Sequence, residues 1–264
     1  MTSKTKRVRN SSMALLNSRK LKQLYSTMLK CRMIQQRARG VSRVFGREAT
    51  EVGATIDLLR DDFIAPSEHE FAFRFMRGEP LQSVFTHLRE TETETPYYVL
   101  NLSDSAEQLS IATGTALAFR WQKQSKVVVA FAAEGATGYV YPHRTLEFAS
   151  HHKLSIVYVI QHNLRAHSAK RNAQPQDYNM PSIIVDGNDI VAIYRVTQEA
   201  IRRAREGHGP ALIHCRNSGA DDPLKVMENY LKQKRLWSDA WKQKIATAFN
   251  RELDRAVAAA NRAR

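Results

Sequence analysis

The chain has 264 residues, 43% of them hydrophobic, and a formal net charge of +14 at pH 7. No apolar run approaches the about 18 residues that a membrane-spanning helix needs, so the composition argues against one. The two cysteines, Cys31 and Cys215, form no C-x-x-C pair. They therefore indicate neither a disulfide framework nor a zinc site, and isolated thiols favour a reducing, cytoplasmic location.

The positive charge is concentrated near the N-terminus. Residues 1–47 contain 13 Lys or Arg and no Asp or Glu, which leaves 27 basic and 26 acidic residues for the rest of the chain. Three interpretations remain open: a basic arm that contacts an acidic surface of a partner subunit, attraction to nucleic acid or a membrane surface, and a transit peptide. Residues 1–17 carry no apolar pattern, so we expect a flexible arm there and a single domain over 18–264.

The first half of the chain is expected to be mainly helical. Apolar residues at helical spacing predict a helix over 19–39, which Gly40 would end, and a second over 47–59. The segment 66–78 follows a proline and shows an alternating pattern. A helix is expected over 80–90, a polar loop over 91–106 and another helix over 107–122.

The second half alternates strands with helices. Buried strands are predicted at 126–133, 154–160, 182–187 and 210–215, from short β-branched runs between turn residues. The helices between and after them are expected at 142–152, 188–207, 224–235 and 238–260, the second of these capped by Asn188 and ended by Gly207. This alternation predicts an α/β fold with a mostly parallel sheet covered by helices on both faces.

Two loops are the best candidates for a ligand site, because ligands of parallel sheets bind at the carboxyl ends of the strands. The first, "AAEGATG", contains Glu134, and the second, "QHNLRAHSAKR", contains Asn163. A carboxylate, an amide oxygen and a nearby carbonyl suit magnesium, with a phosphate completing the coordination. The alternative is that Glu134 caps the following helix and Asn163 closes a turn.

Several motifs resemble one enzyme family. The stretch "VVVAFAAEGATGYVYPHRTLEFASHHKLSIVYVIQHN" follows a pattern of Gly-Asp-Gly and then Asn-Asn about thirty residues later. "GREATEVGA", "DGNDIVAIYRVTQEAIRRAREGHGPALI" and "KQKRLWS" match further segments in the same order. Together they resemble the alpha subunit of the thiamine-diphosphate-dependent decarboxylating component of 2-oxoacid dehydrogenase complexes, of the pyruvate, branched-chain and acetoin type. The resemblance covers about residues 20–260.

The resemblance implies a thiamine-diphosphate-binding fold and a beta subunit that completes the active site in an oligomer. The alpha subunit would hold the diphosphate through Mg²⁺. Carried over by position, the metal ligands are Glu134, Asn163 and the main-chain carbonyl of Arg165. The backbone N–H groups of Gly135 and Ala136 would face the diphosphate.

The chain departs from the family pattern at the positions that carry its chemistry. Ala133 and Glu134 replace the glycine and aspartate of the loop, and His162 replaces the first asparagine of the pair. His69 stands where the family has the arginine that binds the diphosphate. A long loop that carries a catalytic histidine is reduced to "HCRNSGADDP", with Asn217 at the histidine position and His214 at the strand end, so no catalytic residue can be assigned.

Three functions therefore remain open. The first is a divergent alpha subunit with weakened or lost cofactor binding and catalysis. The second is an active alpha subunit that works with a beta subunit to decarboxylate a 2-oxoacid and transfer the acyl group to a lipoyl carrier. The third is a protein that binds nucleic acid or a membrane surface through its basic arm. The sequence does not identify the 2-oxoacid.

Overall fold

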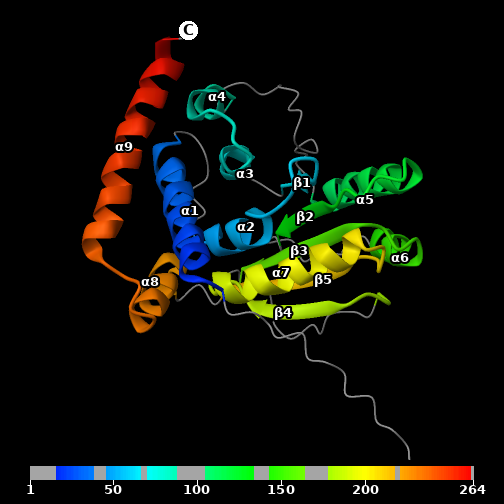
Figure 1. Cartoon of the computed structure of the whole chain (residues 1–264). Helices are drawn as coiled ribbons and strands as arrows, with labels where there is room; N and C mark the ends of the chain where they lie inside the picture. The colour runs from blue at the N-terminus through cyan, green and yellow to red at the C-terminus, as the bar shows by residue number, and fades with distance from the viewer. Residues whose placement is uncertain are drawn as a thin grey trace, which may run out of the picture.

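The computed structural model describes residues 16–38, 46–66, 70–87, 105–133, 143–163, 178–217 and 221–262. In these ranges a five-stranded sheet has the order β1-β2-β3-β5-β4, with parallel pairing between all neighbours (Figure 1). Its strands are β1 (Phe63–Ala65), β2 (Val128–Ala133), β3 (Ile156–Asn163), β4 (Ser182–Asp186) and β5 (Ala211–Asn217). The predicted parallel sheet and the four predicted strands are confirmed.

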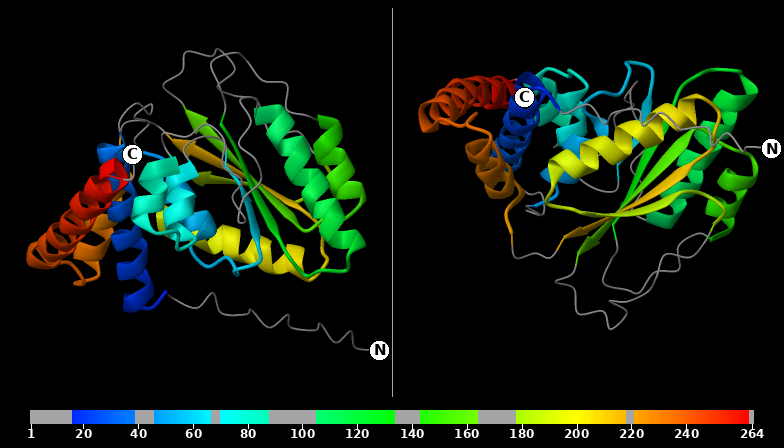
Figure 2. Two further views of the ribbon diagram at one scale, coloured as in Figure 1. Left: turned by 90° about the horizontal axis from the view of Figure 1, so that it is seen from above. Right: turned by 60° about the horizontal axis from the view of Figure 1, so that its bottom comes forward.

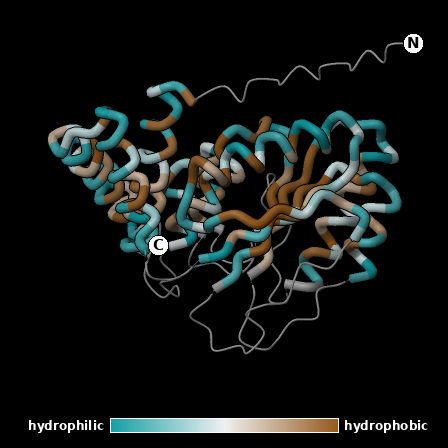
Figure 3. Tube along the Cα trace, turned by 90° about the horizontal axis from the view of Figure 1, so that it is seen from below, coloured by the Kyte–Doolittle hydropathy of each residue, from teal (hydrophilic) through white to brown (hydrophobic). Residues whose placement is uncertain are grey.

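The central strands are buried on both faces because most of their side chains are apolar. In β2, Val129 and Phe131 face one hydrophobic core, while Val128, Ala130 and Ala132 face another. This alternation follows from the two-residue period of a strand. The strands accordingly form the most hydrophobic part of the molecule (Figure 3).

Helices cover the two faces unequally (Figure 2). One face carries α5 (Ser105–Trp121) and α6 (His143–His151), which pack on one core. The other core is built with the remaining helices. These are α1 (Ser18–Arg37), α2 (Glu48–Thr55), α3 (Glu70–Met76), α4 (Leu81–His87), α7 (Ile190–Arg205), α8 (Pro223–Gln233) and α9 (Asp239–Arg262).

Some local predictions needed correction. The alternating segment 66–78 contains helix α3, whose apolar residues Phe71, Ala72 and Phe73 are all buried, so no polar face marks it as a helix in the sequence. Strand β1 was not predicted, because it has only three residues. Asp189, not Asn188, caps α7, while Gly207 ends that helix with a φ of +81°, as expected.

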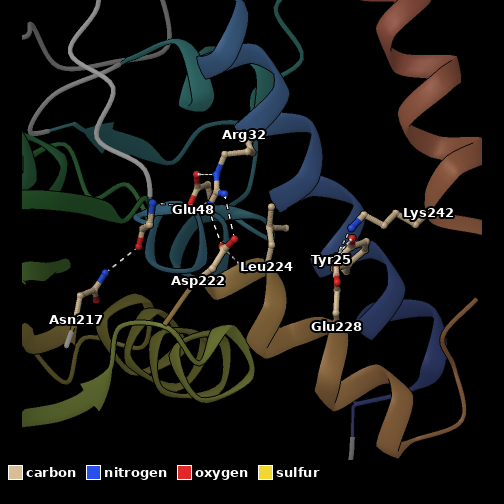
Figure 4. Close-up of polar contacts among 9 residues, drawn as sticks. Tyr25, Arg32, Glu48, Asn217, Asp222, Leu224, Glu228 and Lys242 are labelled. Atoms are coloured by element: carbon tan, nitrogen blue, oxygen red, sulfur yellow. Dashed lines mark hydrogen bonds and ion pairs between the residues drawn. The ribbon is translucent and has the colours of Figure 1, made fainter. Parts of the chain in front are cut away.

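The N- and C-terminal helices pack against each other. The ring of Tyr25 in α1 is fully buried, and its centroid lies 5.0 Å from that of Trp237 and 5.5 Å from that of Trp241. The Tyr25 hydroxyl donates to Glu228, which also accepts from Lys242, both at 2.7 Å (Figure 4). Asn17 caps α1 by accepting from the N–H of Lys20.

Two sequence predictions concern regions that the structure addresses only in part. Most of the predicted basic arm, residues 1–15, lies outside the described ranges, as does most of the predicted loop over 91–106. Within those ranges, none of the helices combines the length and the hydropathy that crossing a bilayer requires.

Candidate functional site

The carboxyl ends of β2, β3 and β5 meet at one edge of the sheet. Ala133, the last residue of β2, pairs with Gln161 of β3, and Asn163, the last residue of β3, pairs with Asn217 of β5. The prediction that the strands before the two candidate loops are neighbours is therefore confirmed. This edge is where a ligand of a parallel sheet binds.

Most of the predicted ligand-binding residues come just after β2 or β3 in the sequence. His69, Glu134, Gly135, Ala136 and Arg165 lie outside the described residues, and of Asn163 only the backbone is described. The predicted metal and diphosphate ligands therefore remain predictions. Among the residues that the structure does describe, no group of three or more His, Cys, Asp or Glu side chains could hold a metal ion.

Asn217 has a structural role at this edge. Its Nδ2 atom donates to the carbonyl of Gly46 at 2.8 Å, just before α2 begins (Figure 4). Its Oδ1 atom is buried and has no hydrogen-bond partner among the described residues. A Cβ added to Gly187 would overlap that oxygen. Asn217 is thus held between Gly187 and Gly46, and it connects the end of β5 to the start of α2.

Replacing Gly187 by alanine is expected to destabilise the protein by about 1 to 3 kcal/mol, because the added methyl group must displace Asn217 from Gly46. The two residues touch, so the cost in an Asn217→Ala background should be lower by at least about 0.5 kcal/mol. Urea denaturation of the single and double variants measures this coupling. Gly114→Ala is the matched control, since a Cβ there meets no atom within 4 Å. Additive effects of Gly187→Ala and Asn217→Ala would contradict the contact.

A pair of histidines occupies the other face of the same edge. The Nε2 atom of His162 lies 2.8 Å from the Nδ1 atom of His214, and the rings stack with centroids 5.1 Å apart. Burial, followed by the electrostatic influence of His162 and Arg216, lowers the pKa of His214 to about 4. His214 is therefore a neutral imidazole near pH 7. The sequence placed His214 at the end of a strand over 210–215, but β5 continues to Asn217, so His214 lies in the middle of the strand. The pair itself was not predicted because β3 and β5 are not consecutive strands.

Several buried polar atoms at this edge have no hydrogen-bond partner in the part of the chain that the structure describes. They are the Nε2 atoms of Gln161 and His214, the Nδ2 atom of Asn188 and the Oδ1 atom of Asn217. Buried polar groups are normally paired, so unpaired ones indicate contact with water or a ligand. The described residues therefore fit a polar ligand, whereas the metal ligands would have to come from Glu134, Asn163 and Arg165.

An ion cluster fixes the start of α2 beside this edge (Figure 4). The Arg32 guanidinium donates to both carboxylate oxygens of Glu48, and its Nη2 atom also donates to Asp222 at 3.0 Å. Glu48 is fully buried and accepts from the N–H of Gly46 at 3.0 Å. The N–H of Gly46 thus donates to Glu48, and the carbonyl of Gly46 accepts from Asn217. The sequence analysis did not identify Glu48, Arg32 or Asp222, because their contacts join segments that are far apart in the sequence.

Glu51, one turn further along α2, is buried and close to Cys31. Burial, and then the negative charge of Glu48, raises the pKa of the Glu51 carboxyl to about 8, although Arg47 acts in the opposite direction. Glu51 is therefore mostly protonated near pH 7. Burial also raises the pKa of the Cys31 and Cys215 thiols, Cys215 to about 12, so neither cysteine is a reactive thiolate.

A cavity of about 550 Å³ lies at the opposite end of the sheet, near the amino ends of β1 and β2. The carboxylate of Asp62 in its wall is already bound by two guanidinium nitrogens of Arg205 and by the N–H groups of Leu59 and Val127. This cavity is separate from the predicted ligand edge.

Comparisons with known proteins agree with the motifs. The family described as dehydrogenase E1 component matches residues 23–218. The 3-methyl-2-oxobutanoate dehydrogenase subunit alpha of Mycobacterium tuberculosis is 30% identical over 237 residues, covering 76% of this chain and 65% of the relative. The pyruvate dehydrogenase E1 component subunit alpha of Acholeplasma laidlawii is 30% identical over 201 residues, covering 69% of this chain and 58% of the relative.

A third relative covers more of both chains. The pyruvate dehydrogenase E1 component subunit alpha of Staphylococcus aureus is 25% identical over 289 residues, covering 92% of this chain and 78% of the relative. The chain spans slightly less than two thirds of the first relative and 58% of the second.

Proposed function

The chain belongs to the dehydrogenase E1 component family, and we propose that it is an alpha-type subunit whose thiamine diphosphate binding and catalysis are weakened or lost. The observation that carries this proposal is the environment of Asn217. It stands at the position of the family's catalytic histidine, and its amide is held by Gly46 and Gly187. A side chain held in this way supports the structure and is not free to act on a substrate.

The substitutions in the predicted cofactor loops support the same conclusion. Glu134 is one methylene longer than aspartate, and magnesium tolerates little distortion from octahedral geometry at about 2.1 Å. Ala133 adds a Cβ where the family has glycine, which restricts the backbone of the loop. His69 lacks the forked guanidinium that binds a diphosphate through two hydrogen bonds.

A second candidate, an active alpha subunit, is favoured by the buried Nε2 atom of Gln161 and the buried Nδ2 atom of Asn188, which have no hydrogen-bond partner among the described residues. In that case Glu134, Asn163 and the Arg165 carbonyl would hold Mg²⁺, and Gly135 and Ala136 would face the diphosphate. The bound cofactor would supply the chemistry that decarboxylates a 2-oxoacid. In either case a beta-type subunit is the proposed partner, and its acidic surface is the proposed contact of the basic arm.

Restoring the family residues should restore binding. In titration calorimetry with Mg²⁺ and thiamine diphosphate, the Ala133→Gly/Glu134→Asp variant is expected to bind more tightly than the unaltered chain, because the shorter acid and freer loop allow regular coordination. Adding His69→Arg should improve affinity by a further factor of about ten or more, since a hydrogen bond to a charged group contributes about 1.5 to 3 kcal/mol.

Two controls separate specific from indirect effects in this series. Glu252→Asp makes the same acid shorter at an exposed position of α9 and should leave affinity unchanged. Asn163→Ala, placed in the restored variant, should remove the gain. If the restored variants bind no better than the unaltered chain, the substitutions at these positions are not what weakens the site.

A further inference from the structure

The cavity at the amino ends of β1 and β2 is lined mainly by charged side chains. They come from the turn before β1, from the segment between α5 and β2, and from the end of α7. The charged residues of this lining are Arg60, Asp61, Asp62, Lys123, Lys126 and Arg205. The volume of about 550 Å³ lies within the range of about 300 to 1,000 Å³ that is usual for small-molecule sites. The cavity therefore suits a small polar ligand.

The charges of the lining favour an anion. Asp62 and Arg205 neutralise each other, because two nitrogens of the Arg205 guanidinium donate to the Asp62 carboxylate at 2.9 and 2.6 Å. Of the other described lining residues, three are bases and one, Asp61, is an acid. The lining thus carries two more positive than negative charges. A concave surface with one sign of charge raises the local concentration of small molecules of the opposite sign.

The three remaining bases are available to a ligand. Arg60 and Lys123 are exposed, and neither side chain has a hydrogen bond or an ion pair within the described ranges. The Lys126 ammonium lies 5.2 Å from the centre of the Phe119 ring. This contact restrains the lysine but leaves its N–H donors open to an anion.

The turn that carries Arg60 is held in place by the protein itself. Arg77 donates to three main-chain carbonyls of this turn, those of Leu59, Arg60 and Asp62, at 2.8, 2.6 and 2.5 Å. The side chain of Asp62 is 1% exposed and accepts from the N–H groups of Leu59 and Val127. A wall that is ordered in advance lowers the entropic cost of binding.

We propose that this cavity binds a small anion with at least two negative charges, carried by phosphate or carboxylate groups. The forked guanidinium of Arg60 can donate two hydrogen bonds to either group, and the two lysines add compact positive charges. The proposal goes beyond the proposed function, because the cavity lies at the opposite end of the sheet from the predicted cofactor edge and shares no residue with it.

Titration calorimetry of the full chain tests the site, with tripolyphosphate, ATP and citrate as separate probes. Mg²⁺ is left out, which disfavours binding at the predicted cofactor edge. At least one probe is expected to bind with a dissociation constant below about 1 mM. Binding of the two phosphate compounds alone would identify phosphate recognition, and binding of citrate alone would identify carboxylate recognition. Absence of binding by all three probes would overturn the proposal.

Lys123→Gly removes one base of the cavity without straining the backbone. Lys123 has a φ of +54°, in the left-handed region that glycine adopts readily, so the melting temperature should not fall. The substitution is expected to weaken anion binding about threefold or more, because it removes a positive charge from the lining. Adding Arg60→Gln should bring the total loss to about tenfold. Unchanged binding in this double variant would place the anion elsewhere and overturn the proposal.

Arg235→Gly is the matched control for Lys123→Gly. Arg235 is an exposed base with a φ of +56° after the end of α8, and its N–H, like that of Lys123, donates to the carbonyl three residues earlier. The control therefore removes the same charge from the same backbone conformation outside the cavity, and affinity should stay unchanged. Equal losses in Arg235→Gly and Lys123→Gly would show a response to the overall charge of the chain, which would also overturn the proposal.

Discussion

Replacing Arg32 by methionine is expected to lower the free energy of unfolding by about 3 to 5 kcal/mol, the usual cost of leaving a buried charge without its partner. Glu48 is fully buried and receives two hydrogen bonds from Arg32, so its carboxylate would lose its neutralising charge. Asp222, which is 34% exposed, can be solvated and contributes less. Chemical denaturation measures the loss.

A double variant and an exposed arginine distinguish this effect from a general loss of an arginine. Arg32→Met combined with Glu48→Met should cost less than Arg32→Met alone, because no buried charge remains. Arg202→Met removes an arginine that bridges Glu199 and Glu206 on the surface of α7, and it should change stability little. If all three variants lost the same stability, the buried cluster would not hold α2 in place.

Replacing Glu51 by glutamine is expected to make the stability of the protein less dependent on pH. The pKa of Glu51 is about 8 in the folded protein, against an ordinary value of 4.5. Between these values the folded state holds a proton that the unfolded state has released, so stability falls as pH rises through this window. From pH 5 to pH 7 the fall attributable to Glu51 is about 2 to 3 kcal/mol, at 1.36 kcal/mol per pH unit.

The comparison of the variant with the unaltered chain isolates this contribution. His214, whose pKa is lowered to about 4, acts in the opposite direction, because stability falls when the pH drops below its ordinary value of 6.5. That effect is present in both proteins and cancels in the difference. Glu252→Gln, at an exposed glutamate of α9, should follow the unaltered chain. A Glu51→Gln variant with the same pH profile as the unaltered chain would show that Glu51 titrates normally.

Short-range patterns predicted most of the fold. β2 is a continuous apolar run, and β3 and β5 begin with one. A short run of this kind between turn residues indicates a buried strand. α3 was not recognised because Phe71, Ala72 and Phe73 are all buried, which removes the polar side of its helical period. The strand order β3-β5-β4 also could not be predicted from the sequence, because neighbouring strands in this part of the sheet are not all consecutive in the chain.

The sequence predicted only those parts of the site that short local motifs mark. The loops after β2 and β3 identified the ligand edge, and the structure brings these strands together. The hydrogen bond from Asn217 to Gly46 joins residues 171 positions apart, and that from Arg32 to Asp222 joins residues 190 positions apart. Contacts of this range leave no periodic signal in one sequence. The structural role of Asn217 therefore required the fold.

The affinity of the unaltered chain for thiamine diphosphate tests the central claim most directly. Titration calorimetry in the presence of excess Mg²⁺ is expected to show no binding tighter than about 100 µM, given the loss of the arginine at position 69 and the longer acid at position 134. Binding in the low micromolar range would contradict this account. It would mean that Glu134 and Asn163 still hold the metal, and that the chain retains the cofactor of its family.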